Sequence, residues 1–248
     1  MTAAKDRLIV ALDVPTAVEA QEIVYELGEM VSFYKIGLQL FTAEGPKIVS
    51  ELVNSGRKVF LDLKLHDIPN TVAGAVKAAS ELGVAMLTVH AGGGSRMLKA
   101  AVEAAATAPT PPIILAVTVL TSLSAADMEE TGIKAETGEQ VLRLARLAKS
   151  AGCGGVVSSP QEAQRLRSEL GPQMAIVTPG IRPGGTAQAD QSRIATPTIA
   201  IKAGASHLVV GRPILAADNR NRAASAILEE IVSALDSSEK EMAGGKPA

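Results

Sequence analysis

The sequence predicts a (β/α)8 barrel, and three observations lead to this fold class. The chain has 248 residues, a length at which parallel α/β barrels commonly form one domain. Short runs of aliphatic and β-branched residues recur eight times, and stretches with the apolar spacing of helices separate them. Eight such units leave about 31 residues for each strand and its helix. An open doubly wound sheet is the alternative, but such sheets usually have fewer strands at this length.

The expected strands are rich in Val, Ile and Leu, as the strands of a barrel core are. In chain order they begin at Leu8 (LIVALD), Phe33 (FYKIG), Lys58 (KVFLDLK), Ala85 (AMLTVH), Ile113 (IILAVTV), Gly154 (GGVVSS), Met174 (MAIVTP) and His207 (HLVVGR). No linker interrupts the series, so we expect one barrel domain over residues 1–248. The tail from Asp236 onward is polar and contains glycine, so it is expected to be frayed.

The stretch after the first strand has the pattern of an amphipathic helix. Thr16 and Glu19 have the spacing of a capping box, and Gly28 suits the position just after the helix end. The apolar face between them consists of Ala20, Ile23, Val24 and Leu27. This pattern predicts a helix between the first two strands.

Two later stretches repeat this pattern. Thr137 and Gln140 have the spacing of a second capping box, at the start of a helix that reaches Gly152. Another helix, with apolar residues from Val72 onward, is expected to end at Gly83. These helices alternate with the strands, as the barrel requires.

Composition excludes several classes of protein. The formal net charge is −2, whereas a nucleic-acid-binding protein normally has a basic excess. The chain has no Trp and five other aromatic residues, none after Phe60, so a stacking platform for single-stranded nucleic acid is excluded. The one cysteine, Cys153, cannot form an internal disulfide or a multi-cysteine zinc site. No apolar run is long enough to span a membrane and the start MTAAKDR is not a signal sequence, so we expect a cytoplasmic protein.

Charged residues lie where the first three strands end. Side chains alternate across a strand, so Asp62 and Lys64 point into the barrel while Leu61 and Leu63 point toward the helices. Asp13 and Lys35 end the neighbouring strands, and Asp67 follows the third. Because charges are rarely buried without partners, these residues are expected to form an alternating acid–base array. A purely structural ion-pair network at the barrel mouth is the alternative interpretation.

The ends of the last two strands indicate an anion site. Arg182 follows the seventh strand and Arg212 the eighth, where barrels of this class recurrently bind phosphate. Gly211 lets an anion approach the backbone, and Pro213 suits the first turn of a helix whose N–H groups face the anion. The alternative is an ordinary turn before a helix.

The sequence LDLKLHDIPNT at Leu61–Thr71 resembles the signature of the orotidine 5′-phosphate decarboxylase family. Asp-x-Lys-x-x-Asp alone also occurs in sister decarboxylases and aldolases, but further matches make the resemblance more specific. These are ALD at Ala11–Asp13, YKIG at Tyr34–Gly37, HAGGG at His90–Gly94, VTVLTS at Val117–Ser122, TPGIRP at Thr178–Pro183 and GRPI at Gly211–Ile214. The chain resembles the bacterial single-function members.

The resemblance implies a role for each charged residue of the array. Lys64 would be the catalytic lysine, Asp62 would lie beside the substrate carboxylate, and Lys35 would complete the array. Asp13 and Lys35 would also contact the ribose. Asp67 would reach the active site of a second subunit in a homodimer.

The resemblance also assigns residues to substrate binding. From the loop of Asp67, Ile68 and Thr71 would reach the partner's site as well. Thr121 and Ser124 would lie near the pyrimidine. The phosphate would be bound or covered by Arg182, Gln191, Gly211 and Arg212.

The implied reaction is the loss of CO2 from orotidine 5′-phosphate without a cofactor or metal. The nearest rivals are 3-keto-gulonate phosphate decarboxylase and hexulose phosphate synthase, which use Mg²⁺. Lys35 argues against them, because a cation at that position repels a metal ion. A phosphate-binding barrel without catalytic activity is the rival from another class, but it has no need of Lys64 between two aspartates.

Overall fold

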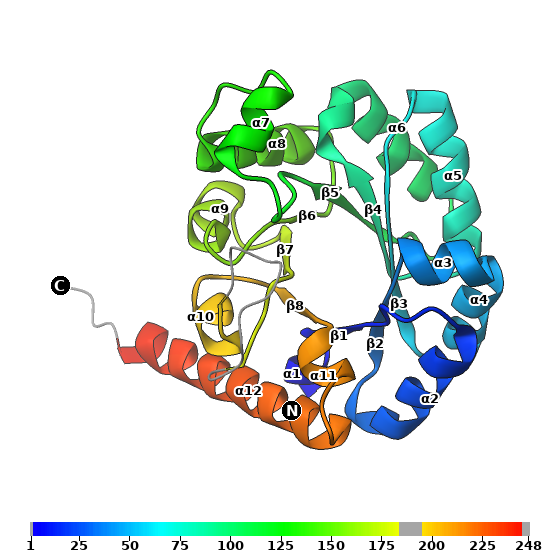
Figure 1. Ribbon diagram of the computed structural model, residues 1–248. Helices are drawn as coiled ribbons and strands as arrows, with labels where there is room; N and C mark the ends of the chain where they lie inside the picture. Colours follow the sequence, from blue (N-terminus) through cyan, green and yellow to red (C-terminus); the bar gives the residue numbers. More distant parts are fainter. Residues whose placement is uncertain (1, 184–194, 245–248) are drawn as a thin grey trace.

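The computed structural model describes residues 2–183 and 195–244, and eight parallel strands in this part of the chain close into a barrel in chain order (Figure 1). The (β/α)8 prediction is therefore confirmed. The strands are β1 (Leu8–Ala11), β2 (Phe33–Gly37), β3 (Lys58–Leu65), β4 (Met86–His90), β5 (Ile113–Val117), β6 (Gly155–Val157), β7 (Ala175–Thr178) and β8 (His207–Val210). Each begins at the predicted residue or one residue later.

The strands separate two apolar layers because their side chains alternate. Inside the barrel, a small cluster is built from Ile9, Ala11, Phe33, Phe60, Met86, Leu115, Val177 and Val209. The other face of each strand belongs to the larger cluster that packs against the helices, with Leu61 fully buried and Leu63 and Leu65 partly buried. The third strand therefore alternates as predicted.

The helices form an outer ring around the strands (Figure 1). The α-helices are α1 (Thr2–Lys5), α2 (Ala17–Leu27), α3 (Leu38–Glu44), α4 (Pro46–Asn54), α5 (Pro69–Glu81), α6 (Gly94–Ala105), α7 (Ala125–Glu130), α8 (Thr137–Ser150), α9 (Ala163–Leu170), α10 (Pro197–Lys202), α11 (Arg212–Leu215) and α12 (Arg220–Gly244). Two 3₁₀ turns, η1 (Gly28–Met30) and η2 (Ala91–Gly93), complete the elements.

The helix ends follow the sequence signals at one site and differ at another. At α2, Thr16 accepts a hydrogen bond from the Glu19 amide at 3.3 Å, and Gly28 has a φ of 48°. At α8 the predicted capping box is wrong, because Thr137 is already the first helical residue and no side chain caps the helix. A capping box forms instead at α7, between Ser124 and Asp127.

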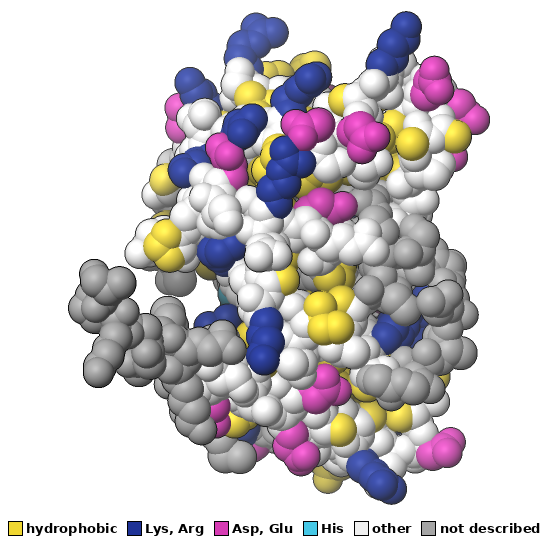
Figure 2. All heavy atoms as spheres, turned by 90° about the vertical axis from the view of Figure 1, so that its left-hand side faces the viewer, with side chains coloured by type: hydrophobic (Ala, Val, Ile, Leu, Met, Phe, Trp, Pro, Cys, Tyr) yellow, Lys and Arg dark blue, Asp and Glu magenta, His cyan; other side chains and the backbone are white. Residues whose placement is uncertain are grey.

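The last helix, α12, continues past Asp236, from where the sequence predicts a frayed tail, and ends at Gly244. It contacts α1, α2 and α10 along one side of the barrel. Within the described residues, no helix has the length and apolar character needed to cross a membrane. Figure 2 shows acidic and basic side chains interspersed on the face toward the viewer, and bridges such as Arg146–Glu169 link α8 and α9.

The amino-terminal end of the barrel is closed by buried and hydrogen-bonded groups. The His207 ring meets Phe33 edge-on at 6.1 Å between centroids, and its buried Nδ1 has no hydrogen-bond partner. Burial lowers the pKa of His207 to about 4. Nearby, Arg167 donates to the carbonyl oxygens of Gly171, Met174 and Gly204 at 2.6 to 3.1 Å and so ties together the loops before β7 and β8.

Candidate active site

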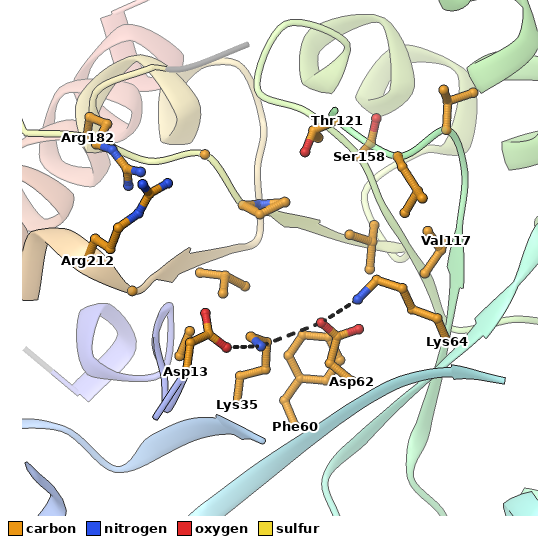
Figure 3. Close-up of a pocket in the computed structure, with 18 residues that line it drawn as sticks. Asp13, Lys35, Phe60, Asp62, Lys64, Val117, Thr121, Ser158, Arg182 and Arg212 are labelled. Atoms are coloured by element: carbon orange, nitrogen blue, oxygen red, sulfur yellow. Dashed lines mark hydrogen bonds and ion pairs between the residues drawn. The ribbon is translucent and has the colours of Figure 1, made fainter. Parts of the chain in front are cut away.

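A cavity of about 260 Å³ opens at the carboxyl ends of the strands. Figure 3 shows two groups of charged side chains on the walls of this cavity. On one side lies what we call the charged row, which consists of Asp13, Lys35, Asp62 and Lys64. Across the cavity from Lys64, the guanidinium groups of Arg182 and Arg212 point toward one another. All six residues were expected at this rim from the sequence.

Alternating ion pairs connect the charged row. Lys35 Nζ lies 2.9 Å from Asp13 Oδ1 and 3.7 Å from Asp62 Oδ2, and Lys64 Nζ lies 2.9 Å from the same Asp62 oxygen. The side chains of Lys35 and Asp62 are 10% and 13% exposed, whereas that of Lys64 is 31% exposed. The centre of the row is thus neutralised within the protein, while the Lys64 ammonium faces the cavity.

The position of Lys64 depends on an irregularity in β3. The pairing with β4 passes from Leu61–Leu87 to Leu65–Val89, so four steps along β3 match two along β4. Within this bulge Lys64 has a φ of 51°, and it is the one non-glycine residue with positive φ among those described. This conformation costs about 1–2 kcal/mol, and such strain is typical of functional sites.

Thr88 on β4 supports the bulge, and sequence reasoning missed it. Its hydroxyl accepts a hydrogen bond from the Lys64 amide at 2.9 Å and donates one to Asp62 Oδ1 at 3.0 Å. The side chain is fully buried. The signal in the sequence was a single hydroxyl in the apolar run AMLTVH, on the strand adjacent to the DLK motif.

One glycine leaves room for the charged row. A Cβ atom on Gly37 would lie 2.7 Å from Lys35 Nζ, whereas one on Gly211 would make an ordinary contact of 3.5 Å with Asp13 Oδ2. A side chain at Gly37 would therefore push the Lys35 ammonium away from its carboxylates. Gly211 lies just before Arg212, so it also leaves the backbone open to a ligand beside the arginines.

The arginine side of the cavity is held by backbone contacts. The Arg182 amide donates to the Ala195 carbonyl at 2.9 Å, and the Ala195 amide donates to the Gly180 carbonyl at 3.2 Å. Arg212 is the first residue of α11, with Pro213 in its first turn, as expected from the sequence. The pair of guanidinium groups is suited to bind a phosphate or carboxylate.

Neutral residues form the remaining wall. Thr121 lines the cavity as predicted, and Ser158, a residue that sequence reasoning did not single out, lies beside it (Figure 3). Ser124 does not line the cavity; its hydroxyl and amide both bond to Asp127 at 2.7 Å.

The remaining predicted residues lie apart from this wall or cannot be placed. Asp67, Ile68 and Thr71 are exposed at the start of α5 and do not line the cavity of their own subunit. Gln191 lies outside the described residues.

Two histidines lie next to the charged row. The rings of His66 and His90 stack at 5.1 Å between centroids, and His90 Nδ1 accepts a hydrogen bond from the Gly92 amide at 3.3 Å. Burial lowers the pKa of His90, and the neighbouring His66 and Lys64 lower it further. Both effects disfavour a charged His90 ring beside Lys64.

No group of three or more His, Cys, Asp and Glu side chains suited to hold a metal ion occurs in residues 2–183 or 195–244. The charged row carries a lysine between its carboxylates, an arrangement unsuited to a divalent cation. That the reaction needs no metal or cofactor stays a prediction.

A family model described as orotidine 5′-phosphate decarboxylase / HUMPS family matches residues 6–227. The chain belongs to this family. A relative from Halorhodospira halophila named orotidine 5′-phosphate decarboxylase is 53% identical over 228 residues, which cover 92% of this chain and 97% of the relative. A relative of the same name from Moorella thermoacetica is 51% identical over 234 residues, covering 92% of this chain and 93% of the relative.

Two solved structures have the same fold. The crystal structure of orotidine 5′-phosphate decarboxylase from Lactobacillus acidophilus matches with a TM-score of 0.82 at 41% identity, covering 90% of this chain and 98% of that chain. An uncharacterised conserved protein from Geobacillus kaustophilus matches with a TM-score of 0.80 at 36% identity, covering 90% and 99%. Family membership therefore agrees with the sequence motifs and with the barrel.

Proposed function

We propose that this chain decarboxylates orotidine 5′-phosphate to uridine 5′-phosphate and CO2, the last step of de novo pyrimidine biosynthesis. Relatives that share about half of its residues over nearly their whole length carry the name of this enzyme. The observation that carries the proposal is the pairing of charged row and arginines across one cavity. One side suits a phosphate, and the other suits a reaction that develops negative charge.

The substrate would span the cavity. Its phosphate would bind Arg182 and Arg212 beside Gly211, with Gln191 as a further contact expected from the family pattern. Its ribose hydroxyls would meet Asp13 and Lys35 in the middle of the charged row. The pyrimidine ring would then lie near Thr121, with its carboxylate next to Asp62 and Lys64.

In the chemical step, the bond between C6 and the carboxylate carbon breaks, and its electron pair stays on C6. The pair cannot delocalise into the ring π-system, so it needs a fixed positive charge beside it. The Lys64 ammonium supplies this charge in a partly dry site, where electrostatic stabilisation is strong. Lys64 then donates a proton to C6 and regains one from water.

Asp62 keeps the Lys64 ammonium in place through the ion pair of 2.9 Å. Since Lys35 also faces Asp62, the carboxylate is attracted from two sides and stays fixed when substrate enters. A fixed dipole of this kind stabilises developing charge without reorganising during the reaction.

The proposal includes a homodimer in which Asp67, Ile68 and Thr71 act in the partner's cavity. These three residues are exposed on their own subunit, and the side chain of Ile68 is 66% exposed. Burial against a second copy would account for that exposure. A sedimentation measurement on Ile68→Asp tests this part: a monomeric variant supports it, and an unchanged dimer contradicts it.

Ultraviolet absorbance tests the reaction itself. Mixing the protein with orotidine 5′-phosphate, with and without EDTA, should give the absorbance change of uridine 5′-phosphate formation at equal rates. Tight binding of the nucleotide without any absorbance change would favour the phosphate-binding barrel. Activity that EDTA removes would favour the metal-dependent sister chemistry.

A further inference from the structure

Thr88 makes two directional hydrogen bonds to the charged row. An amide can only donate, so the Thr88 oxygen must accept from the Lys64 amide, at 2.9 Å. The single hydroxyl proton of Thr88 is then free for Asp62 Oδ1, at 3.0 Å. One side chain thus fixes the backbone of Lys64 and the carboxylate of Asp62 at the same time.

The bonds to Asp62 occupy both of its oxygens. Oδ1 faces the Thr88 hydroxyl, and Oδ2 faces the ammonium groups of Lys64 and Lys35 at 2.9 and 3.7 Å. Without the Thr88 bond, the carboxylate is free to rotate about its terminal torsion and move Oδ2 away from the lysines. The geometry of the charged row therefore depends on a group outside it.

The backbone of Lys64 needs the same support. Its φ of 51° is a conformation that side-chain-bearing residues rarely adopt, and it lies in the bulge where β3 leaves its ladder with β4. Strained conformations persist only where the surroundings fix them. The Thr88 oxygen is the partner of the Lys64 amide in this bulge.

Thr88 does not line the cavity and is fully buried beneath it, so it does not touch a bound ligand directly. We propose that Thr88 is a positioning residue for the decarboxylation: it sets the angle of the Asp62 carboxylate and the direction in which Lys64 enters the cavity. This inference rests on the proposed function. According to this inference, the buried Thr88 hydroxyl on β4 contributes to kcat and does not contribute to the affinity for the phosphate group.

The decisive variant is Thr88→Val, which keeps the β-branched shape and removes the hydroxyl. Loss of a hydrogen bond to a charged group corresponds to about a 10- to 100-fold change, and we expect kcat to fall by that factor. KM and the affinity for uridine 5′-phosphate should change less than about threefold, because the arginines that hold the phosphate are untouched. Thr88→Ser should restore kcat to within about threefold of the wild type.

Thr118 offers a matched control. It is a buried threonine near the end of β5 whose hydroxyl donates to the Val157 carbonyl at 2.9 Å, without contact to the charged row. Thr118→Val should reduce the thermal midpoint about as much as Thr88→Val and leave kcat unchanged. If Thr88→Val does not fold, Thr88→Ala removes the same hydroxyl with less bulk.

The outcomes separate the inference from the proposed function. A wild-type chain without decarboxylase activity refutes the proposed function. An active wild type with a folded Thr88→Val variant of equal kcat overturns only the role of Thr88. The role is equally overturned if Thr88→Ser does not restore kcat, if the loss lies in KM alone, or if Thr118→Val loses as much kcat.

Discussion

The two ends of the barrel are built from the same eight strands but differ in structure: the carboxyl end is open and charged, and the amino end is closed and apolar. At the carboxyl end, four charged side chains and two arginines surround a cavity of about 260 Å³. At the amino end, apolar side chains close the barrel, and the half-buried His207 has no hydrogen-bond partner for its buried Nδ1. At the carboxyl end the residues of the charged row form ion pairs with one another. At the amino end burial lowers the pKa of His207 and so favours its neutral form.

The comparison indicates that the carboxyl end of the barrel serves catalysis and the amino end serves stability. The cavity end contains strain at Lys64 and a chain of ion pairs that lines a cavity, features typical of a site selected for chemistry. The closed end contains Arg167, which ties three loop carbonyls together. Substitutions at one end should therefore change kinetics, and substitutions at the other should change stability.

The largest effect is expected for Lys64→Ala. The variant loses both the positive charge at C6 and the proton donor, so kcat/KM should fall by about 10⁴-fold or more. Its melting temperature should stay near the wild-type value, because alanine can keep the same backbone contacts. Lys58→Ala, at the other end of the same strand, is the control and should retain full activity. Near-normal turnover by Lys64→Ala would refute the assigned role.

Arg212→Ala should have the next largest effect. Losing one cation at the phosphate end should lower kcat/KM by about 10²- to 10³-fold, because phosphate binding contributes to the rate as well as to affinity. Steady-state kinetics on the variant measure this, with Arg146→Ala on the outer surface as the control. Unchanged kcat/KM with orotidine 5′-phosphate would place the phosphate elsewhere.

Arg167→Met tests the closed end. Removing the guanidinium leaves the carbonyls of Gly171, Met174 and Gly204 without their donors, which should cost about 3 kcal/mol of stability. Urea unfolding measures the loss, and kcat/KM at 25 °C should not change. Arg165→Met, an exposed position on the same helix, should leave both quantities near the wild type. A kinetic defect in Arg167→Met would contradict the division between the two ends.

His207 gives the smallest predicted effect, and it appears only in acid. Burial holds its pKa at about 4 in the folded state, against about 6.5 in the unfolded chain. Below pH 6.5, His207 therefore binds a proton in the unfolded state but not in the folded state, so the free energy of unfolding falls as the pH decreases toward 4. Between pH 7 and pH 5 this contributes about 2 kcal/mol. In urea titrations at both pH values, His207→Gln should lose that part of the pH dependence; an identical dependence in both proteins would show that another group is responsible.

Most of the barrel was predictable because each strand is a short apolar run bounded by polar or glycine-containing segments. The charged row was predictable as well, since alternation along β3 separates Asp62 and Lys64 from the leucines that face the helices. The arginine pair followed from closure of the barrel, which brings the ends of β7 and β8 side by side.

Features that depend on three-dimensional context were not predictable. Ser124 and Thr137 both begin a capping-box pattern, but only at Ser124 does the chain turn so that the hydroxyl faces the free amides; at Thr137 the backbone is already helical. The left-handed conformation of Lys64 was not predictable, because such a conformation is usually signalled by a glycine and this position is a lysine. From the sequence alone, Thr88 resembles an ordinary core residue. Its role becomes apparent only from the bulge in β3, the strand that pairs with its own strand β4.

The hydrogen bond from the Lys64 amide to Thr88 also has a consequence for amide hydrogen exchange. In a regular ladder, backbone carbonyls protect amide protons, and exchange reports on opening of the sheet. The Lys64 proton is protected by a side-chain oxygen instead. Its exchange rate can therefore be changed by one hydroxyl while the neighbouring strands keep their protection, so the state of the active site can be followed in the resting protein before any substrate is added.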